Sequence, residues 1–322
     1  MVRFLGYLVL ALTAAQPAFG WGCTGHQTVA LIARGQLAPH ARRMVDDLLS
    51  GTPIDPGLHR FCAPTRLDLM AEVATWADDE RDREPRTAGW HFLDVPIGVA
   101  RGPLDRFCDP SAGCVTQAIQ KQLDILKSAT ATRTDKVRAL MFVIHLVGDL
   151  HQPLHVVTNN DRGGNCLPVA FLGRQPHLGD PAKGNYRPEL HGIWDTELPE
   201  RAGNVRHGSH DADVQAFANA LAREFSGLIP QWRREPVDLD SWAWEGHQRA
   251  AQDAYGRLPK PVTFETPAPV RECSDDDRVS DRLARLHESI EPPYIKAVTP
   301  VVRKQLAKAG TRLAMLLTQL WK

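Results

Sequence analysis

Apolar residues recur at the three- and four-residue spacing of amphipathic helices along most of this 322-residue chain, whereas alternating runs rich in Val, Ile and Thr are scarce. This pattern favours helices that pack through apolar faces over a fold built on a large sheet. We therefore expect an all-α protein: a single helical domain with long irregular loops. Helices are predicted over residues 25–34, 39–49, 66–77, 115–127, 133–150, 191–198, 211–228, 239–255 and 294–321.

Gly, Pro and Asp cluster in three segments, 52–64, 161–188 and 258–277, which we expect to be irregular. None has the composition of a long flexible linker, and the chain shows no internal repeat. One domain is the simplest organisation for a chain of this length, which can bury a sizeable core.

The first twenty residues have the pattern of a signal peptide. Arg3 is followed by an apolar run from Phe4 to Ala15, with Ala18 and Gly20 at the small positions before a cleavage site. The run is shorter than the roughly 20 apolar residues of a membrane-spanning helix, which makes a membrane anchor the weaker alternative. We expect residues 1–20 to be removed, residues 21–322 to form the mature domain, and the protein to be secreted or periplasmic with no membrane anchor.

Charge and cysteine content give two further expectations. Lys+Arg and Asp+Glu both number 38, so any binding of polyanions must come from local charges or metal ions rather than from an overall basic field. Export makes the six cysteines candidates for disulfides. Cys108 and Cys114 flank the turn sequence DPSAG and could close a small loop, while the other pairings stay open.

The stretch FVIHLVGDLHQPLHVV, residues 142–157, places polar groups inside an otherwise apolar helix. His145 and Asp149 stand at i and i+4, which puts both side chains on one helical face. His155 follows Pro153, which should end the helix and turn the chain back. Unpaired polar groups in a core would cost several kcal/mol, so a shared ion is the better explanation of these three residues.

The same grouping recurs elsewhere. His191 and Asp195 repeat the i, i+4 geometry in LHGIWDTEL, Asp78 follows an apolar helix in TWADDERD, and His91 lies in GWHFLDVP. Imidazole and carboxylate ligands without thiolates are typical of zinc sites that keep positions open for water. This indicates metal catalysis. His151 is extra to the set, and either orients a ligand or faces solvent.

Cleavage before Trp21 would also free an α-amino group near His26. An α-amine has a pKa of about 7.7–8.0 and binds metals once deprotonated. The alternative is that Trp21 is an ordinary buried terminus.

These segments, taken in order, resemble the zinc-dependent single-strand nucleases and 3′-nucleotidases of the S1/P1 type. The resemblance rests on WAD, WHF, HxxGDxxQPLH, DRGGN, HxxWD and the terminal helix, and covers nearly the whole mature chain. It implies three zinc ions. Their ligands would be Asp78, His91 and His145 for one zinc; Asp149 as a bridge to the second; the amino nitrogen and carbonyl oxygen of Trp21 with His26 for the second; and His155, His191 and Asp195 for the third.

The resemblance further implies endonucleolytic hydrolysis of single-stranded DNA and RNA to 5′-phosphate products, with 3′-nucleotides as additional substrates. Zinc lowers the pKa of bound water to about 7, which supplies a nucleophile. Asp78 and Asp149 would serve catalysis as well as metal binding. Arg81 matches the family arginine near the scissile phosphate, its alternative being an ordinary exposed arginine.

Base recognition is expected in HFLD. Phe92 would stack on a base, which is worth about 1–3 kcal/mol and requires an unpaired strand, and Asp94 would accept hydrogen bonds from it. The alternative for Phe92 is a plain core position. Asn165 of DRGGN could contact a ligand or cap a turn.

Two rival functions remain at this stage. A zinc-dependent phospholipase C resembles these nucleases in fold and three-zinc site, although Phe92, Asp94 and Asp195 favour the nuclease. A non-catalytic zinc-binding protein would have closed four-coordinate sites, whereas carboxylate-bridged ions with open positions indicate catalysis.

Overall fold

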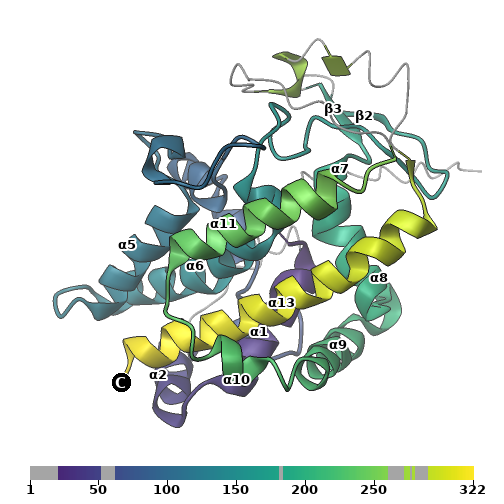
Figure 1. The fold of residues 1–322 in the computed structure, drawn as a ribbon. Coiled ribbons are helices and arrows are strands. Elements are labelled where there is room, and N and C mark those ends of the chain that lie inside the picture. Colours follow the sequence, from purple (N-terminus) through teal and green to yellow (C-terminus); the bar gives the residue numbers. More distant parts are fainter. Residues whose placement is uncertain (1–20, 52–61, 181–183, 260–271, 276–277, 280–288) are drawn as a thin grey trace, which may run out of the picture.

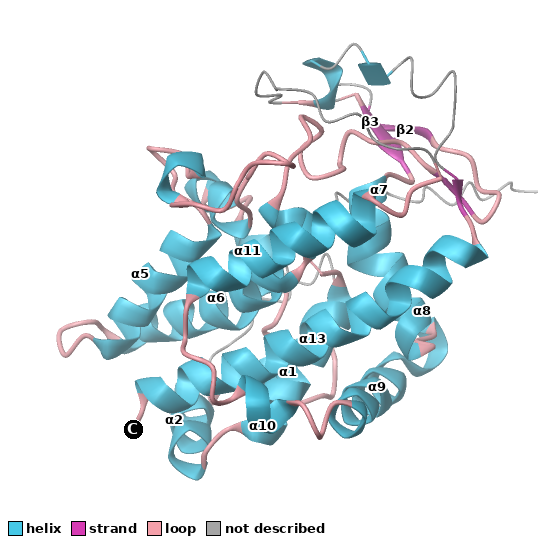
Figure 2. Cartoon of the chain, viewed as in Figure 1, coloured by secondary structure: helices cyan, strands magenta, loops and turns pink. Residues whose placement is uncertain are grey.

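The computed structural model describes residues 21–51, 62–180, 184–259, 272–275, 278–279 and 289–322 (Figure 1). The predicted signal peptide, residues 1–20, and parts of the three predicted irregular segments lie outside these ranges. Helices dominate the described part of the chain, which confirms the all-α fold class (Figure 2). No helix within the described ranges has both the length and the apolar character needed to cross a membrane.

The α-helices have the following bounds: α1 Cys23–Gln36, α2 Pro39–Leu49, α3 Leu69–Glu72, α4 Trp76–Glu80, α5 Val115–Lys127, α6 Arg133–His151, α7 Leu190–Gly192, α8 Leu198–Gly203, α9 His210–Glu224, α10 Ile229–Trp232, α11 Leu239–Arg249 and α13 Pro292–Leu320. Short 3-10 helices include η2 Pro85–His91, η3 Asp105–Phe107, η4 Pro153–Val156 and η6 His207–Ser209. Two π-helical segments, η5 Ile193–Glu197 and η7 Ala250–Tyr255, continue α7 and α11.

Helix α6 runs through the centre of the bundle and contacts α1, α2, α4, α5, α11 and α13. Thr132 and Asp135 form a capping box at its start, and every residue from Ala139 to His151 is buried. The helix ends because Gln152 is extended before Pro153, which cannot continue it. The polar face of α6 is therefore held at the middle of the core.

Helices α1 and α13 pack closely against each other in the bundle (Figure 1). A Cβ atom built on Gly310 would lie 2.6 Å from the Cβ of Ile32, so glycine is what lets the two backbones approach. This packing fixes α1, which begins two residues after Trp21.

The helix predicted over residues 66–77 is wrong as a single element. The structure divides it into α3 and α4 around a turn at residues 73–75. At this turn the Asp78 N–H donates to the Thr75 carbonyl (3.1 Å), not to Ala74, so the Ala74 carbonyl is free to accept from His145 Nδ1 (2.7 Å). A long-range hydrogen bond thus takes the place of a helical one.

Strands are few and short in the described part. β1 (Ala170–Phe171) pairs in parallel with β4 (Ser289–Ile290), and β2 (His177–Asp180) pairs antiparallel with β3 (Asn185–Arg187). β1 to β3 fall in the segment predicted to be irregular. They lie over one end of the bundle (Figure 2).

Three disulfides join all six cysteines: Cys23–Cys62, Cys108–Cys114 and Cys166–Cys273. The loop predicted between Cys108 and Cys114 is therefore confirmed. The end of this loop contacts the HFLD segment, because the N–H of Val115, next to Cys114, donates to the Phe92 carbonyl (3.1 Å).

Candidate metal centre

Asp78, His91 and His145 form the first cluster of possible ligands. They come from α4, η2 and α6, and all three are buried. His91 Nδ1 lies 3.1 Å from His145 Nε2, and Asp78 Oδ1 lies 3.6 and 3.5 Å from these two nitrogens. Residues separated by up to 67 positions thus direct ligand atoms at one point.

Asp149 faces two groups of ligands at once. Its Oδ2 lies 3.0 Å from His91 Nδ1 and 3.1 Å from His145 Nε2, while its Oδ1 lies 3.3 Å from His26 Nε2. The rings of His26 and His145 stack with centroids 3.9 Å apart. One carboxylate on α6 is therefore placed between the first cluster and a second one that contains His26.

His155, His191 and Asp195 form the third cluster. The Nε2 atoms of the two histidines lie 3.1 Å apart, and Asp195 Oδ2 lies 3.3 Å from His191 Nε2. Asp195 belongs to the π-helical segment η5, a departure from regular helix that is frequent at functional sites.

Three of these histidines are oriented by backbone carbonyls. The Nδ1 atoms of His145, His155 and His191 each lie 2.7 Å from a carbonyl oxygen, of Ala74, His91 and Gly163 respectively. A ring that donates from Nδ1 carries its lone pair on Nε2. In each case Nε2 is the atom that faces the cluster, as a metal ligand requires.

The DRGGN segment holds His191 through its backbone. Asp161 accepts from the Gly164 N–H (3.0 Å) and from the Tyr255 hydroxyl (2.9 Å), which fixes the turn. Gly163 has a φ of 61°, and a Cβ there would lie 2.2 Å from the Leu154 carbonyl oxygen. Only glycine can bring this carbonyl to His191.

Gln152 orients Asp195. Its Oε1 accepts from the Leu154 N–H (2.6 Å), so its Nε2 is the atom that donates to Asp195 Oδ1, also at 2.6 Å. Both side chains are buried. With Oδ1 engaged in this way, Oδ2 is the oxygen left to face the third cluster.

The clusters fit zinc. Two nitrogens bound about 2.0–2.1 Å from a tetrahedral zinc lie about 3.3 Å apart, close to the 3.1 Å found in both the first and the third cluster. Within the described residues, Asp78 Oδ1, Asp149 Oδ1, Asp195 Oδ2 and both ring nitrogens of His26 are buried without a hydrogen-bond partner. Buried polar atoms are costly unless satisfied, and bound cations would satisfy these.

The protonation of the ligands also agrees with a cation site. Burial lowers the pKa of His91 to about 4, helped by Arg81, and burial with the neighbouring His155 lowers that of His191 to about 3. Burial opposes the charge of His145, but Asp149 and Asp78 outweigh it and raise its pKa to about 9. The carboxylates thus attract positive charge, which a metal supplies in place of a proton.

Arg81 lies beside the first cluster, with its Nη2 3.4 Å from Asp78 Oδ1 and its side chain 14% exposed. The alternative of an ordinary exposed arginine is therefore wrong. Burial lowers the pKa of the Arg81 guanidinium, while Asp78 and Asp149 act in the opposite direction.

Phe92 and Asp94 lie at the surface next to the third cluster. Phe92 is 39% exposed, which excludes the alternative of a plain core position. The Leu93 N–H between them donates to the His155 carbonyl (2.8 Å), which ties this segment to a cluster residue. Asp94 is accessible to solvent, but the protein packed around it raises the pKa of its carboxyl to about 6.

Trp21 lies beside His26. A Cβ built on Gly148 would lie 2.8 Å from His26 Nδ1 and 3.8 Å from Trp21 Cδ1, so both residues pack on this glycine of α6. The Trp21 side chain is fully buried. The adjacent Gly22 N–H donates to the Asp195 carbonyl (2.7 Å), which joins this segment to the third cluster's helix.

His151 has neither of the two roles expected for it. It is buried rather than solvent-facing, and it contacts Arg312 Nη1 (2.9 Å) and the Val147 carbonyl (2.8 Å), not a predicted ligand. The sequence, in turn, predicted no role for Gln152, although it lies in the motif QPLH, whereas the glycines of DRGGN were expected to allow a close approach of the backbone, as Gly163 does.

A model of the S1/P1 nuclease family matches residues 21–322. The chain is 28% identical to nuclease S1 of Aspergillus oryzae, covering 98% of this chain and 96% of that protein. It is 27% identical to endonuclease 2 of Arabidopsis thaliana, with 97% and 94% covered, and 24% identical to nuclease P1 of Penicillium citrinum, with 91% and 95% covered.

Proposed function

Because this chain belongs to the S1/P1 nuclease family, we propose that it is a trinuclear zinc phosphodiesterase that cuts single-stranded DNA and RNA endonucleolytically to 5′-phosphate products and removes phosphate from 3′-nucleotides. Nucleases among its relatives, along nearly the whole chain, support phosphodiester hydrolysis. The observation that carries the zinc centre is Asp149, whose two oxygens face different ligand groups.

The nine ligand positions are those predicted from the sequence. Asp78, His91 and His145 would hold one ion, and Asp149 would bridge it to a second held by Trp21 and His26. His155, His191 and Asp195 would hold the third. Bound zinc would polarise phosphate oxygens and lower the pKa of water to about 7.

The chain's own residues would position the substrate. Arg81, held beside Asp78, would direct its guanidinium at the phosphate and offset charge that develops on its oxygens. Asp78 would orient the attacking water. Phe92 is exposed and able to stack on an unpaired base, while Asp94 would accept hydrogen bonds from that base.

The proposed function includes export of the protein. We infer that residues 1–20 are a signal peptide and that residues 21–322 form the mature zinc nuclease domain, secreted or periplasmic. The family model begins at residue 21, which supports this boundary. Cleavage there would free the Trp21 amine beside His26. A version with one extra residue before Trp21 should lose zinc and activity.

The deciding experiment is a zinc-dependent assay on single-stranded oligonucleotides with analysis of the product ends. We expect cleavage within the strand, 5′-phosphate ends, loss of activity with a chelator and recovery with zinc. Phosphatidylcholine is included as a substrate. Lipid cleavage without nucleotide release would instead support a phospholipase C, and fewer than two zinc ions per chain without any phosphodiesterase activity would support a non-catalytic zinc-binding protein.

A further inference from the structure

A cleft opens from the metal centre, and the predicted base-binding residues do not line it. Asp78 of the first cluster and Asp195 of the third both line it, whereas Phe92 and Asp94 do not. Its volume is about 1050 Å³. Pockets for one small ligand measure about 300–1,000 Å³, so this cleft has room for more than the group being cleaved.

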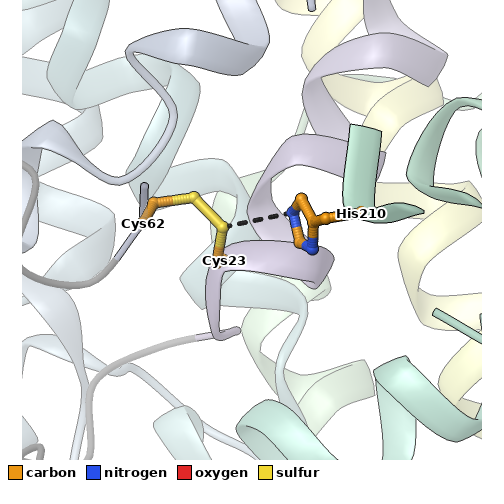
Figure 3. Close-up of side chains that lie close together, drawn as sticks. All are labelled: Cys23, Cys62 and His210. Atoms are coloured by element: carbon orange, nitrogen blue, oxygen red, sulfur yellow. Dashed lines mark hydrogen bonds between the residues drawn. A yellow bond between two sulfur atoms is a disulfide. The ribbon is translucent and has the colours of Figure 1, made fainter. Parts of the chain in front are cut away.

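One wall of the cleft is rigid. Cys23 and Cys62 line it as a disulfide, and His210 Nε2 lies 3.5 Å from Cys23 Sγ (Figure 3). His210 Nε2 also contacts Gln27 Oε1 (2.8 Å). These sulfurs and the imidazole have the spacing of a metal site, but sulfurs bonded to each other are not the thiolates that metals bind. The group therefore forms a fixed surface rather than a fourth metal site.

Two arginines from separate parts of the chain line the cleft. Arg66 precedes α3 and is exposed, and its backbone N–H donates to Asp211 Oδ2 (2.8 Å) at the start of α9. Arg187 lies half-buried in β3. Neither side chain forms an ion pair with another described residue, in contrast to Arg174, which pairs with Glu197 at 2.6 Å.

Most acidic residues of the cleft are engaged, although Glu200, half-buried beside Glu197, forms no ion pair within the described residues. Glu197 binds Arg174, and Asp211 accepts from the Thr65 hydroxyl (2.9 Å) as well as from the Arg66 N–H. Glu189 is buried and accepts from the Gly192 N–H. Asp78 and Asp195 would be neutralised by metal. Arg187 also acts on the buried Glu189 carboxyl, whose pKa it lowers against the effect of burial. Arg66 and Arg187 are nevertheless the arginines of the cleft that form no ion pair within the described residues.

We propose that this cleft binds the nucleotides on the 3′ side of the cleaved bond, with Arg66 and Arg187 contacting the phosphates that follow it. This rests on the proposed function, in which the base on the 5′ side stacks on Phe92. The nucleotides after the cleaved bond must then continue past the metal centre. The cleft is the space available to them there, because Asp78 and Asp195 of the metal centre line it. Contacts to phosphates alone would accept any base.

The test compares substrates that differ only in length on the 3′ side. A dinucleotide has the scissile phosphate alone, whereas a tetranucleotide with a free 5′-hydroxyl adds two phosphates for the cleft. Release of the unphosphorylated 5′-terminal nucleoside reports the cut at the first bond in both. For the zinc-loaded protein we expect kcat/KM for this cut to be several-fold higher with the tetranucleotide, chiefly through KM.

Salt and substitution then identify the contacts. Each phosphate contact to a single strand contributes about 0.7 to the slope of log affinity against log salt, so two contacts cost about sevenfold between roughly 50 and 200 mM salt. Arg66→Gln with Arg187→Gln should remove both this salt effect and the gain with length, and leave dinucleotide cleavage unchanged. Arg43→Gln with Arg223→Gln is the matched control, because both arginines are exposed and do not line the cleft.

The outcomes separate the two proposals. If the wild-type protein cleaves neither substrate, the proposed function is wrong. If it cleaves both with equal kcat/KM, or if the gain with length survives in the Arg66 and Arg187 double variant, the cleft does not bind the 3′ side of the substrate. A double variant that loses dinucleotide cleavage as well would also overturn the inference, because it would place these arginines in the catalytic site itself.

Discussion

Replacing Asp94 with asparagine should abolish a pH dependence of base binding centred near pH 6. Protein packed around the carboxyl raises its pKa to about 6, with Asp161 adding repulsion and Arg162 opposing it. The carboxylate that accepts hydrogen bonds from a base is therefore present above pH 6 and lost as the pH falls through it. Between about pH 7 and pH 5 the ionised fraction falls from about nine-tenths to about one-tenth, so binding that needs the carboxylate weakens by up to about tenfold, and by less where solvent screens this exposed group.

The assay is the inhibition constant of guanosine, which offers amino and imino donors but has no phosphate that titrates in this range. Zinc is held in excess and its content measured at each pH, because the histidine ligands also gain protons in acid. Asp94→Asn should bind guanosine more weakly at pH 7 and show little change down to pH 5. Asp105→Asn, at an exposed aspartate in η3, is the control and should behave as wild type. An Asp94→Asn protein with the wild-type pH profile would show that this carboxyl does not contact the base.

Three further substitutions test how the metal centre is held. Asp149→Asn should lower zinc content by about two ions per chain, because one carboxylate serves two clusters; full zinc and full rate would refute the bridge. Gln152→Leu should free Asp195 Oδ1 and weaken one zinc site by about 10–100-fold, measured by chelator competition. Gln152→Glu keeps the acceptor for the Leu154 N–H but cannot donate to Asp195, so it should weaken the same site; an unchanged affinity in both variants would leave Gln152 a purely structural residue. Gly163→Ala should displace the carbonyl that holds His191, so the same site should empty while the helical circular dichroism persists, and retention of three ions would contradict this.

The helices were predictable where apolar spacing and local end signals agree. The predicted bounds of α2 and α5 match the structure, because Pro39 starts α2 and β-branched Val115 begins an amphipathic run after the Cys108–Cys114 loop. The break between α3 and α4 was not predictable. It depends on a carbonyl that accepts from His145, 71 residues away, and no pattern inside residues 66–77 reports that contact.

In the candidate site, too, contacts between residues close in sequence were predictable, whereas contacts between distant residues were not. The i, i+4 spacing of His145 with Asp149 and of His191 with Asp195 predicted that each pair shares a face, and the structure brings them within 3.1 and 3.3 Å. Their role as ligands stays a prediction. The residue that orients Asp195 could not be found this way, because Gln152 meets it across 43 positions of sequence.

The Tyr255 hydroxyl reaches Asp161 across 94 residues, and through the turn at Gly163 it supports His191. The third cluster therefore depends on a residue that the ribosome adds some sixty positions after the last predicted ligand. A chain interrupted before Tyr255 would contain all nine predicted ligand positions and still lack the hydroxyl that supports the turn orienting one of them. With zinc bound as proposed, filling all three sites would then require synthesis past Tyr255 and folding of the DRGGN turn, so that activity would follow completion of the protein.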